Sequence, residues 1–596
     1  MIVPNQNRID YGDNLRAPVG FELSYAIATT FSLDLDALLC LPVALCLDST
    51  LEGDLKGEKM AMLEAIGQLS GRLKVFFQQG NISAPHSFNR LFTLLEPCIV
   101  PVVPGEVFSS FHPKIWLLRF IDARKKVRYR LLVLSRNLTF DRSWDLAVTL
   151  EGEVRDARNA ESDGLIDLLT GLASKAPDFA VAFSAFKKEL PFVQWARPPG
   201  FGRLETLLGD DRRVPINFGR GTDSILVISP FLHPKALDFL KSKAANRWLF
   251  SRAEEMNRIG EARLADWECY CLSERVVSGE DDIDDLDHAM VQNLHAKAIF
   301  VKNGDTTHWH VGSANATTAA LGDGTALPRN TEFMLRMSGS GSDLSPQQAI
   351  HELVGSPEEP TGIFVRHVFE AATEIEEPLD SQVRRQLVHQ LINTQWTVSA
   401  RSDDENTYTC SVGFSPDFRN IAPEHLAAIE VGQISFGSFK PLSSPLVWSG
   451  MATTQISAFL RLRIVIGVDA AWEGIVKAAL KIEGGDRRDQ KIYAELIDSQ
   501  EKFMAYVQML LQPDCDRAEL FGIDLSRSFN TAGDGALNKL ISGPVFESLL
   551  RSASRQPEQL RRIDILLNRL NSMNVKVPVK FQHLWKQYKT FLGTTK

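Results

Sequence analysis

Two matching segments constrain the fold of this 596-residue chain more than any other feature. The first is His112-Pro113-Lys114, followed downstream by Ser135-Arg136-Asn137, and the second is His295-Ala296-Lys297, followed by Ser313-Ala314-Asn315. A motif pair that occurs twice in the same order indicates an internal duplication. We therefore expect a fold in which two diverged halves each supply one copy.

Each His-x-Lys triplet lies in sequence that is typical of a strand, FHPKIWLLRF and NLHAKAIFV. In a strand, residues i and i+2 point to the same face, so each His and its Lys would share one face. Two such strands side by side would gather two imidazoles, two ammonium groups and two amides in one pocket. This set suits phosphodiester chemistry: one His attacks phosphorus, the other protonates the leaving oxygen, and the Lys and Asn groups hold the phosphate oxygens.

The first 340 residues alternate strand-like and helical stretches in the same order twice, which predicts an α/β sandwich in each half. We expect the halves to be related by pseudo-two-fold symmetry. After about Met337 the pattern becomes β-rich and then helical. The predicted units are residues 1–156 (first half), 157–205 (helical linker), 206–340 (second half), 345–482 (accessory β-rich domain) and 485–596 (helical domain with a basic end).

The composition favours a globular protein of the reducing cytoplasm. Apolar residues make up 44% and charged residues 23% of the chain, near the averages for globular domains. No apolar run reaches the roughly 18–20 residues of a membrane span, and the N-terminus has no signal-peptide pattern. The seven cysteines are scattered and odd in number, which indicates structural thiols rather than disulfides. We expect no metal and no cofactor.

The net charge of −9 hides a gradient. From Arg551 to Lys596, ten basic residues stand against Glu558 and Asp564, and a second basic cluster lies between the first His-x-Lys and its Ser-x-Asn. Such clusters either bind phosphates or form solvated loops. The aromatics near the C-terminus, Phe581 and Trp585 among them, either stack on bases or form a helix core. The predicted nucleic-acid contacts are Arg124, Lys125, Lys126, Arg128, Arg561, Arg562, Lys586 and Lys589.

The paired motifs resemble those of the phospholipase D superfamily, over about residues 20–340. The superfamily's fuller motif often has an Asp five positions after the Lys, where this chain has Arg119 and Lys302. The tyrosyl-DNA phosphodiesterase branch also lacks this Asp. Its Ser-Ala-Asn context is similar to SRNLT and GSANATTAAL here.

The resemblance implies a role for each motif residue. His112 would be the nucleophile that forms a phosphohistidine, and His295 the general acid, although the opposite assignment stays open. The lysines Lys114 and Lys297 would bind phosphoryl oxygens together with the asparagines. The supporting residues are the acids Asp145 and Glu332, which would orient the histidines, and the motif serines Ser135 and Ser313. A surface position for both acids is the alternative.

Three further histidines have simpler explanations. His233-Pro234-Lys235 is a His-x-Lys with no Ser-x-Asn after it, and Pro234 fits the first turn of a helix. His308 and His310 alternate in a strand without an obvious carboxylate or cysteine partner, so a packed strand is favoured over a metal site.

The sequence favours a metal-independent nuclease or related phosphodiesterase acting on DNA or RNA, with a bacterial genome-defence or restriction role by analogy only. The alternatives are a phospholipid-hydrolysing enzyme and a catalytically inactive nucleic-acid-binding subunit. The expected partner is a nucleic acid substrate, and no integral-membrane association is expected. Because the chain has no GxxxxGK[ST] motif, an ATP-driven step would need a helicase or ATPase partner. A homodimer is also compatible with the sequence.

Overall fold

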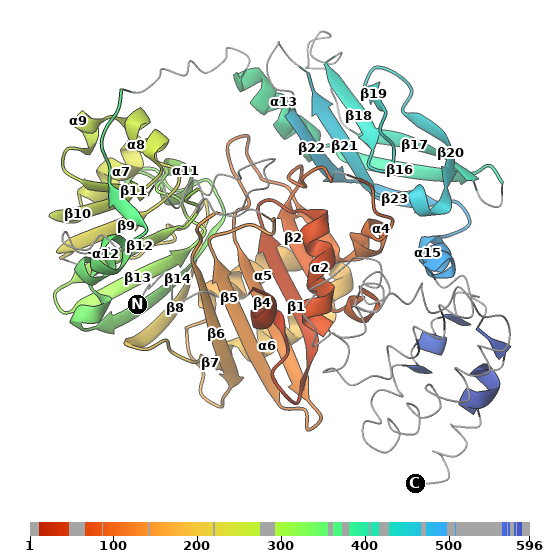
Figure 1. The fold of residues 1–596 in the computed structure, drawn as a ribbon, viewed down its shortest axis with the longest axis horizontal. Helices are drawn as coiled ribbons and strands as arrows, with labels where there is room; N and C mark the ends of the chain where they lie inside the picture. The colour runs from red at the N-terminus through yellow and green to blue at the C-terminus, as the bar shows by residue number, and fades with distance from the viewer. Residues whose placement is uncertain are drawn as a thin grey trace, which may run out of the picture.

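The computed structural model describes most of the chain up to residue 496. It covers residues 11–46, 66–85, 87–140, 143–218, 221–273, 293–355, 362–371, 381–404, 407–415, 428–465 and 472–496, then Phe503, Val507 and short stretches between 563 and 586. The fold is mixed α/β, as predicted, and its sheets are shown in Figure 1.

The first large sheet has seven strands in the order β3-β2-β1-β4-β5-β6-β7. Its strands are β1 (Phe21–Thr30), β2 (Leu73–Gln78), β3 (Ile99–Val102), β4 (Ile115–Asp122), β5 (Val127–Leu134), β6 (Ala147–Val154) and β7 (Val193–Trp195). The helices around it are α1 (Tyr11–Leu15), α2 (Leu35–Cys46), α4 (Phe92–Leu95), α5 (Asp163–Ala173) and α6 (Ala180–Glu189). β1, β2 and β3 are parallel, while β4, β5, β6 and β7 continue the sheet in antiparallel pairs.

The second large sheet has eight strands in the order β15-β11-β10-β9-β12-β13-β14-β8. Its strands are β8 (Phe201–Gly209), β9 (Ser224–Ile228), β10 (Asn246–Phe250), β11 (Glu268–Leu272), β12 (Ala298–Asn303), β13 (Thr306–Gly312), β14 (Glu332–Ser340) and β15 (Phe364–Arg366). Its helices are α7 (Pro234–Lys241), α8 (Ala253–Ile259), α9 (Glu261–Leu264), α11 (Thr318–Leu321) and α12 (Pro346–Val354).

The six central strands of the second sheet repeat the strand order of the first, β11-β10-β9-β12-β13-β14 against β3-β2-β1-β4-β5-β6. The two large sheets therefore share one strand order over six strands. The stretch predicted as a linker contains α5 and α6 but also gives β7 to the first sheet and the start of β8 to the second.

One hydrophobic core joins the two large sheets. Ile115 and Leu131 of the first sheet, Phe300 and Phe333 of the second, and Phe186 of α6 belong to the same buried cluster. Burial of so much apolar surface between the sheets fixes their relative position. The outer face of the first sheet packs against α2, and that of the second against α7.

The β-rich domain begins after residue 345, where it was predicted to start, because α12 and β15 belong to the second large sheet and its core. The domain consists of two four-stranded sheets, β20-β17-β16-β23 and β19-β18-β21-β22. Its elements are α13 (Ser381–Asn393), β16 (Gln395–Ser402), β17 (Thr407–Ser415), β18 (Ile429–Gln433), β19 (Phe439–Pro441), β20 (Val447–Ala452), β21 (Phe459–Ile464), β22 (Trp472–Lys477), β23 (Ala479–Ile482) and the following α15 (Arg488–Leu496). The alternation of apolar and basic residues in β21 buries Leu460, Leu462 and Ile464 in the core of this domain.

The β-rich domain packs against the edge of the first sheet near β2 and β3 (Figure 1). At the centre of this contact, the buried Glu96 carboxylate accepts hydrogen bonds from Ser457 Oγ and Ala458 N, both at 2.8 Å. Arg488 completes its surroundings with an ion pair of 2.7 Å. Burial raises the pKa of Glu96, while Arg488 opposes that rise.

Candidate active site

Both His-x-Lys triplets lie just before a strand of their own half, and the prediction that they lie within strands was wrong. His112 to Lys114 precede β4, and His295 to Lys297 precede β12. The reason is that these extended segments pair with the other half. The residue before His112 forms a parallel bridge with Thr331, and the residue before His295 forms one with Trp144.

The first histidine is held by an acid of the second half. His112 Nδ1 lies 2.9 Å from Glu332 Oε2. Glu332 is fully buried at the start of β14, where Ser313 Oγ donates to Oε2 at 2.5 Å and Asn330 Nδ2 donates to Oε1 at 3.0 Å. With both carboxylate oxygens occupied, Glu332 can accept the ring N–H and fix the His112 tautomer with a free Nε2.

The second histidine is held by an acid of the first half. His295 Nδ1 lies 3.1 Å from Asp145 Oδ1, and Ser135 Oγ donates to the same oxygen at 3.0 Å. Each half thus supplies the acid that orients the histidine of the other half. The surface alternative for the two acids is wrong, because Glu332 is fully buried and the Asp145 side chain is only 11% exposed.

The two lysines lie deep beside the histidines. Lys114 Nζ donates to the His112 carbonyl oxygen at 3.1 Å, and Lys297 Nζ donates to that of His295 at 2.6 Å and approaches the Ser135 carbonyl oxygen of the other half at 3.4 Å. Burial and then the positive charge of Lys297 hold the pKa of Lys114 well below its ordinary value. Two buried ammonium groups that repel each other make a favourable place for an anion.

The motif asparagines complete the set. Asn137 and Asn315 follow β5 and β13, and in both the side-chain oxygen Oδ1 is buried with no hydrogen-bond partner among the described residues. Asp145 Oδ2 is also buried without a hydrogen-bond partner among these residues. Buried polar atoms are normally satisfied, so these orphaned atoms mark a place that a ligand or water would complete.

Burial is the largest influence on both imidazoles. It lowers the pKa of His112 to about 4, while the charge of Glu332 acts in the opposite direction. Burial also lowers the pKa of His295, whereas the hydrogen bond that the ring donates to Asp145 raises it. Lys297 of the second half lowers the pKa of His112, and Lys114 of the first half lowers that of His295. The electrostatics therefore join the two motif copies in one site.

Two site residues were missed in the sequence. Asn330 donates to Glu332 from two positions earlier, just before β14 begins, and no motif marks it in the sequence. Phe31, which follows β1, meets the His112 ring edge-on, with 5.2 Å between the ring centroids. Lys114 Nζ lies 5.9 Å from the centroid of the Phe31 ring. No sequence motif marks Phe31.

The structure does not bring the predicted basic cluster to this site. Lys125 and Lys126 lie in the β4–β5 turn, at the end of the sheet away from Lys114 and Ser135, and Arg124 lies beside them. Arg128 lies over the Phe21 ring at 4.8 Å and, like Lys126, approaches Glu153 at 3.5 Å.

The described part of the C-terminal segment packs as core. Phe581 and Trp585 are buried against the first half's hydrophobic cluster, and Phe581 contacts the Phe503 ring. This decides between the two interpretations of these aromatics in favour of a helix core. Lys586 is exposed, while Arg561, Arg562 and Lys589 lie outside the described residues.

The other histidines are structural, as predicted. His233 caps the N-terminus of α7, where its Nδ1 accepts from Lys235 N. His310 is buried and bonds the Ile299 carbonyl oxygen, and His308 bonds Ser338 Oγ. In the part of the chain that the structure describes, no group of three His, Cys, Asp or Glu side chains could hold a metal ion.

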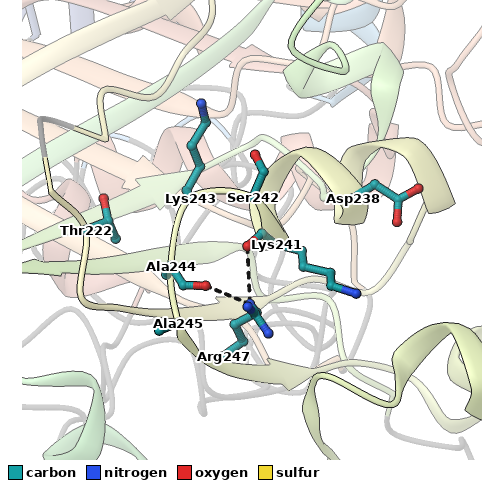
Figure 2. A pocket seen from close by; sticks show the side chains of 8 residues that line it. All are labelled: Thr222, Asp238, Lys241, Ser242, Lys243, Ala244, Ala245 and Arg247. Carbon is teal, nitrogen blue, oxygen red and sulfur yellow. Dashed lines mark hydrogen bonds between the residues drawn. The ribbon is translucent and has the colours of Figure 1, made fainter.

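A surface hollow lies at the opposite end of the second sheet, beyond the C-terminus of α7 (Figure 2). It is lined by Thr222, Asp238, Lys241, Ser242, Lys243, Ala244, Ala245 and Arg247. The Arg247 side chain is already engaged there by the carbonyl oxygens of Lys241 and Ala244 (Figure 2). It holds none of the motif residues, so the candidate site is the one around the two histidines.

Among solved structures, the chain is similar to yeast tyrosyl-DNA phosphodiesterase, which belongs to the superfamily that the motifs resemble. One such structure is 12% identical, covers 55% of this chain and 85% of its own, and has a TM-score of 0.35. A variant of the yeast enzyme is 9% identical, covers 58% of this chain and 87% of its own, and has a TM-score of 0.37. No protein-family model and no curated protein matches the chain. Likeness at this level does not establish an activity, which has to be argued from the side chains.

Across the described residues, no helix combines the length and the apolar character needed to span a membrane.

Proposed function

We propose that this chain is a metal-independent phosphodiesterase that cleaves nucleic acid through a phosphohistidine intermediate. The observation that carries the proposal is the pair of crossed contacts, His112 with Glu332 and His295 with Asp145. In each, the ring nitrogen Nδ1 faces a carboxylate, which leaves Nε2 of both rings for chemistry. We take the two halves to be related by an approximate two-fold axis through this site.

In the first step, neutral His112 attacks phosphorus through Nε2. A P–N bond forms, the bond from phosphorus to the leaving oxygen breaks, and His295 in its protonated form gives its proton to that oxygen. The lowered pKa of His112 suits the nucleophile, because the ring is neutral at neutral pH. A bound phosphodiester brings a negative charge to His295, which favours the protonated acid.

In the second step, His295 takes a proton from water while the water oxygen bonds to phosphorus. The P–N bond breaks, and His112 returns to its starting state. Lys114 and Lys297, with Asn137 and Asn315, stabilise the charge on the phosphoryl oxygens through both steps. They are already placed and dehydrated, so little reorganisation is needed.

The rim of the site favours nucleic acid as the substrate. Phe108 is 51% exposed with the Arg329 guanidinium 5.7 Å from its ring centroid, and Phe231 is 42% exposed with Arg252 at 4.8 Å. Arg252 Nε also donates to the carbonyl oxygen of the residue before His295, so this pair adjoins the site. Exposed aromatics beside arginine can stack on bases while the cation meets phosphates.

The test compares substrates and variants. The purified protein, H112A and H295A are incubated with single-stranded DNA, duplex DNA, RNA and phosphatidylcholine liposomes. We expect cleavage of a nucleic acid by the wild type and nearly complete loss in both variants. Cleavage of the liposomes alone would assign the chain to lipid hydrolysis, and binding without cleavage to a non-catalytic subunit.

A second comparison isolates the rim. F108A and F231A should lower kcat/KM for a nucleic acid while preserving the hydrolysis of bis(p-nitrophenyl) phosphate, which has no bases. Phe414, exposed on β17 of the β-rich domain, offers the control F414A, which should change neither reaction. Equal losses on both substrates in the rim variants would contradict base stacking at the rim.

A further inference from the structure

Two buried hydroxyl groups occupy matching places in the two halves. Thr30 is the last residue of β1, and Ser229 directly follows β9, the strand at the same position in the second sheet. Each residue is 1% exposed. Neither belongs to the His-x-Lys or Ser-x-Asn motifs.

Each hydroxyl makes the same two hydrogen bonds. Thr30 Oγ1 accepts from Leu138 N at 3.0 Å and donates to the carbonyl oxygen two residues on at 2.6 Å. Ser229 Oγ accepts from Ala316 N at 2.9 Å and donates to the carbonyl oxygen two residues on at 2.7 Å. The acceptor bond matters here because Leu138 directly follows Asn137, and Ala316 directly follows Asn315.

The backbone repeats the same match. Leu33 forms a parallel bridge with Leu138, and Leu232 forms one with Ala316. The N–H of the next residue in each case bonds the Leu138 or Ala316 carbonyl oxygen at 2.9 Å. The residue after each motif asparagine is therefore held at its N–H by a hydroxyl and at its C=O by a strand-like bridge.

The asparagine side chains need this support. Within the described ranges, Oδ1 of Asn137 and of Asn315 is buried without a hydrogen-bond partner. A side chain whose oxygen is not held by a hydrogen bond takes more of its direction from its backbone. A shift of the peptide would therefore move the amide directly, and small displacements in a preorganised site are costly to rate.

We propose that Thr30 and Ser229 are positioning residues, whose hydroxyls aim the amides of Asn137 and Asn315 at the scissile phosphodiester. The inference rests on the phosphodiesterase function proposed above and adds the two residues that set its phosphate-binding geometry. The two hydroxyls have the same role in the two halves, and each acts through its asparagine and not directly on the substrate.

The first test removes each hydroxyl. T30V and S229A should lower kcat for nucleic acid about tenfold with KM within about twofold, and T30S, which keeps the hydroxyl, should restore kcat. Thr206 provides a matched control, because its buried hydroxyl also accepts from a backbone N–H (Leu165, 3.2 Å) and donates to a carbonyl oxygen (Glu161, 2.9 Å), away from the site. T206V should lose stability but keep kcat.

The second test asks whether the hydroxyls act through the asparagines. In an N137A background, T30V should lower kcat no further, and S229A should be equally silent in an N315A background. Additive losses, or a T206V variant as slow as T30V, would overturn the positioning role. If T30V does not fold, S229A and its cycle carry the same test. A wild type without phosphodiesterase activity would instead overturn the function itself.

Discussion

Replacement of Glu332 by Gln is the sharpest test of the crossed site. The substitution keeps the side-chain volume but replaces the carboxylate, whose two oxygens accept hydrogen bonds from His112, Ser313 and Asn330. A Gln amide has one acceptor oxygen, so at least one of these buried donors loses its partner. An unsatisfied buried donor costs about 1–3 kcal/mol, which sets the expected loss of folding free energy for E332Q.

The effect on catalysis should be larger. Without the carboxylate, the His112 ring is free to take the tautomer with the proton on Nε2, which cannot attack phosphorus. A comparable loss of a tautomer-fixing acid in a serine protease costs about 10⁴ in kcat. We expect E332Q to lower kcat by about 10²- to 10⁴-fold, through the step that forms the phosphohistidine.

D145N should fail at a different step. His295 protonates the leaving oxygen and later activates water, so a substrate with a good leaving group such as p-nitrophenolate needs only the second role. With a thymidine p-nitrophenyl phosphate ester, D145N should form the covalent intermediate and accumulate it, while E332Q should form little.

Rapid-quench measurement of p-nitrophenolate and acid-labile protein-bound phosphate would separate the two variants. E205Q is the control, because Glu205 pairs with Arg336 at 3.0 Å in the same sheet but away from the histidines. If D145N and E332Q behaved alike, the assigned roles of His112 and His295 would be refuted. If E332Q accumulated the intermediate and D145N did not, the two roles would have to be exchanged. Wild-type rates in E332Q would reject the tautomer argument.

Three further outcomes follow from the same contacts. Activity should survive EDTA, since the proposed nucleophile is a side chain, and a requirement for added Mg²⁺ or Mn²⁺ would contradict the mechanism. Because the pKa of His112 is lowered to about 4, kcat/KM should fall as pH drops through that value and the nucleophile becomes protonated. Because the pKa of His295 also lies below its ordinary value, kcat/KM should fall again as pH rises and the general acid loses its proton. A kcat/KM profile that climbs into the alkaline range would exclude this pair. R488A should lower the free energy of unfolding by about 3–5 kcal/mol in urea titrations, because the buried Glu96 carboxylate loses its ion-pair partner. A variant as stable as the wild type would show that this ion pair does not anchor the β-rich domain.

The sequence predicted what depends on short-range pattern. The two motif copies lie at equivalent places, just before β4 and just before β12, because matched sequence folded into matched strands. Asp145 and Glu332 were expected as orienting acids because the family that the motifs resemble implies an acid after each asparagine. The structure joins them to the histidines.

What could not be predicted depends on how the halves meet. Nothing local in NTEFML shows that Glu332 belongs to His112, since that pairing requires the two sheets to share a core. The triplets look like strand sequence, yet their bridges reach the other half. Thr30 is an ordinary strand threonine until the partner of its hydroxyl is known. Basic residues at the β4–β5 turn are close to the site in sequence but lie at the far end of the sheet.

The two buried lysines are held close to each other at an electrostatic cost. Lys114 is 1% exposed, and burial and the charge of Lys297 hold its pKa well below the ordinary value. A bound anion should therefore reduce the repulsion between the Lys114 and Lys297 side chains. Inorganic phosphate should therefore raise the melting temperature, and at 100 times its Kd should add about 2.7 kcal/mol of stability. K114M should lose most of this effect, whereas K243M, which removes an exposed lysine of the hollow in Figure 2, should keep it. If phosphate stabilised K114M as much as the wild type, the lysines would not form the anion site, and the phosphoryl-binding role assigned to them would be wrong.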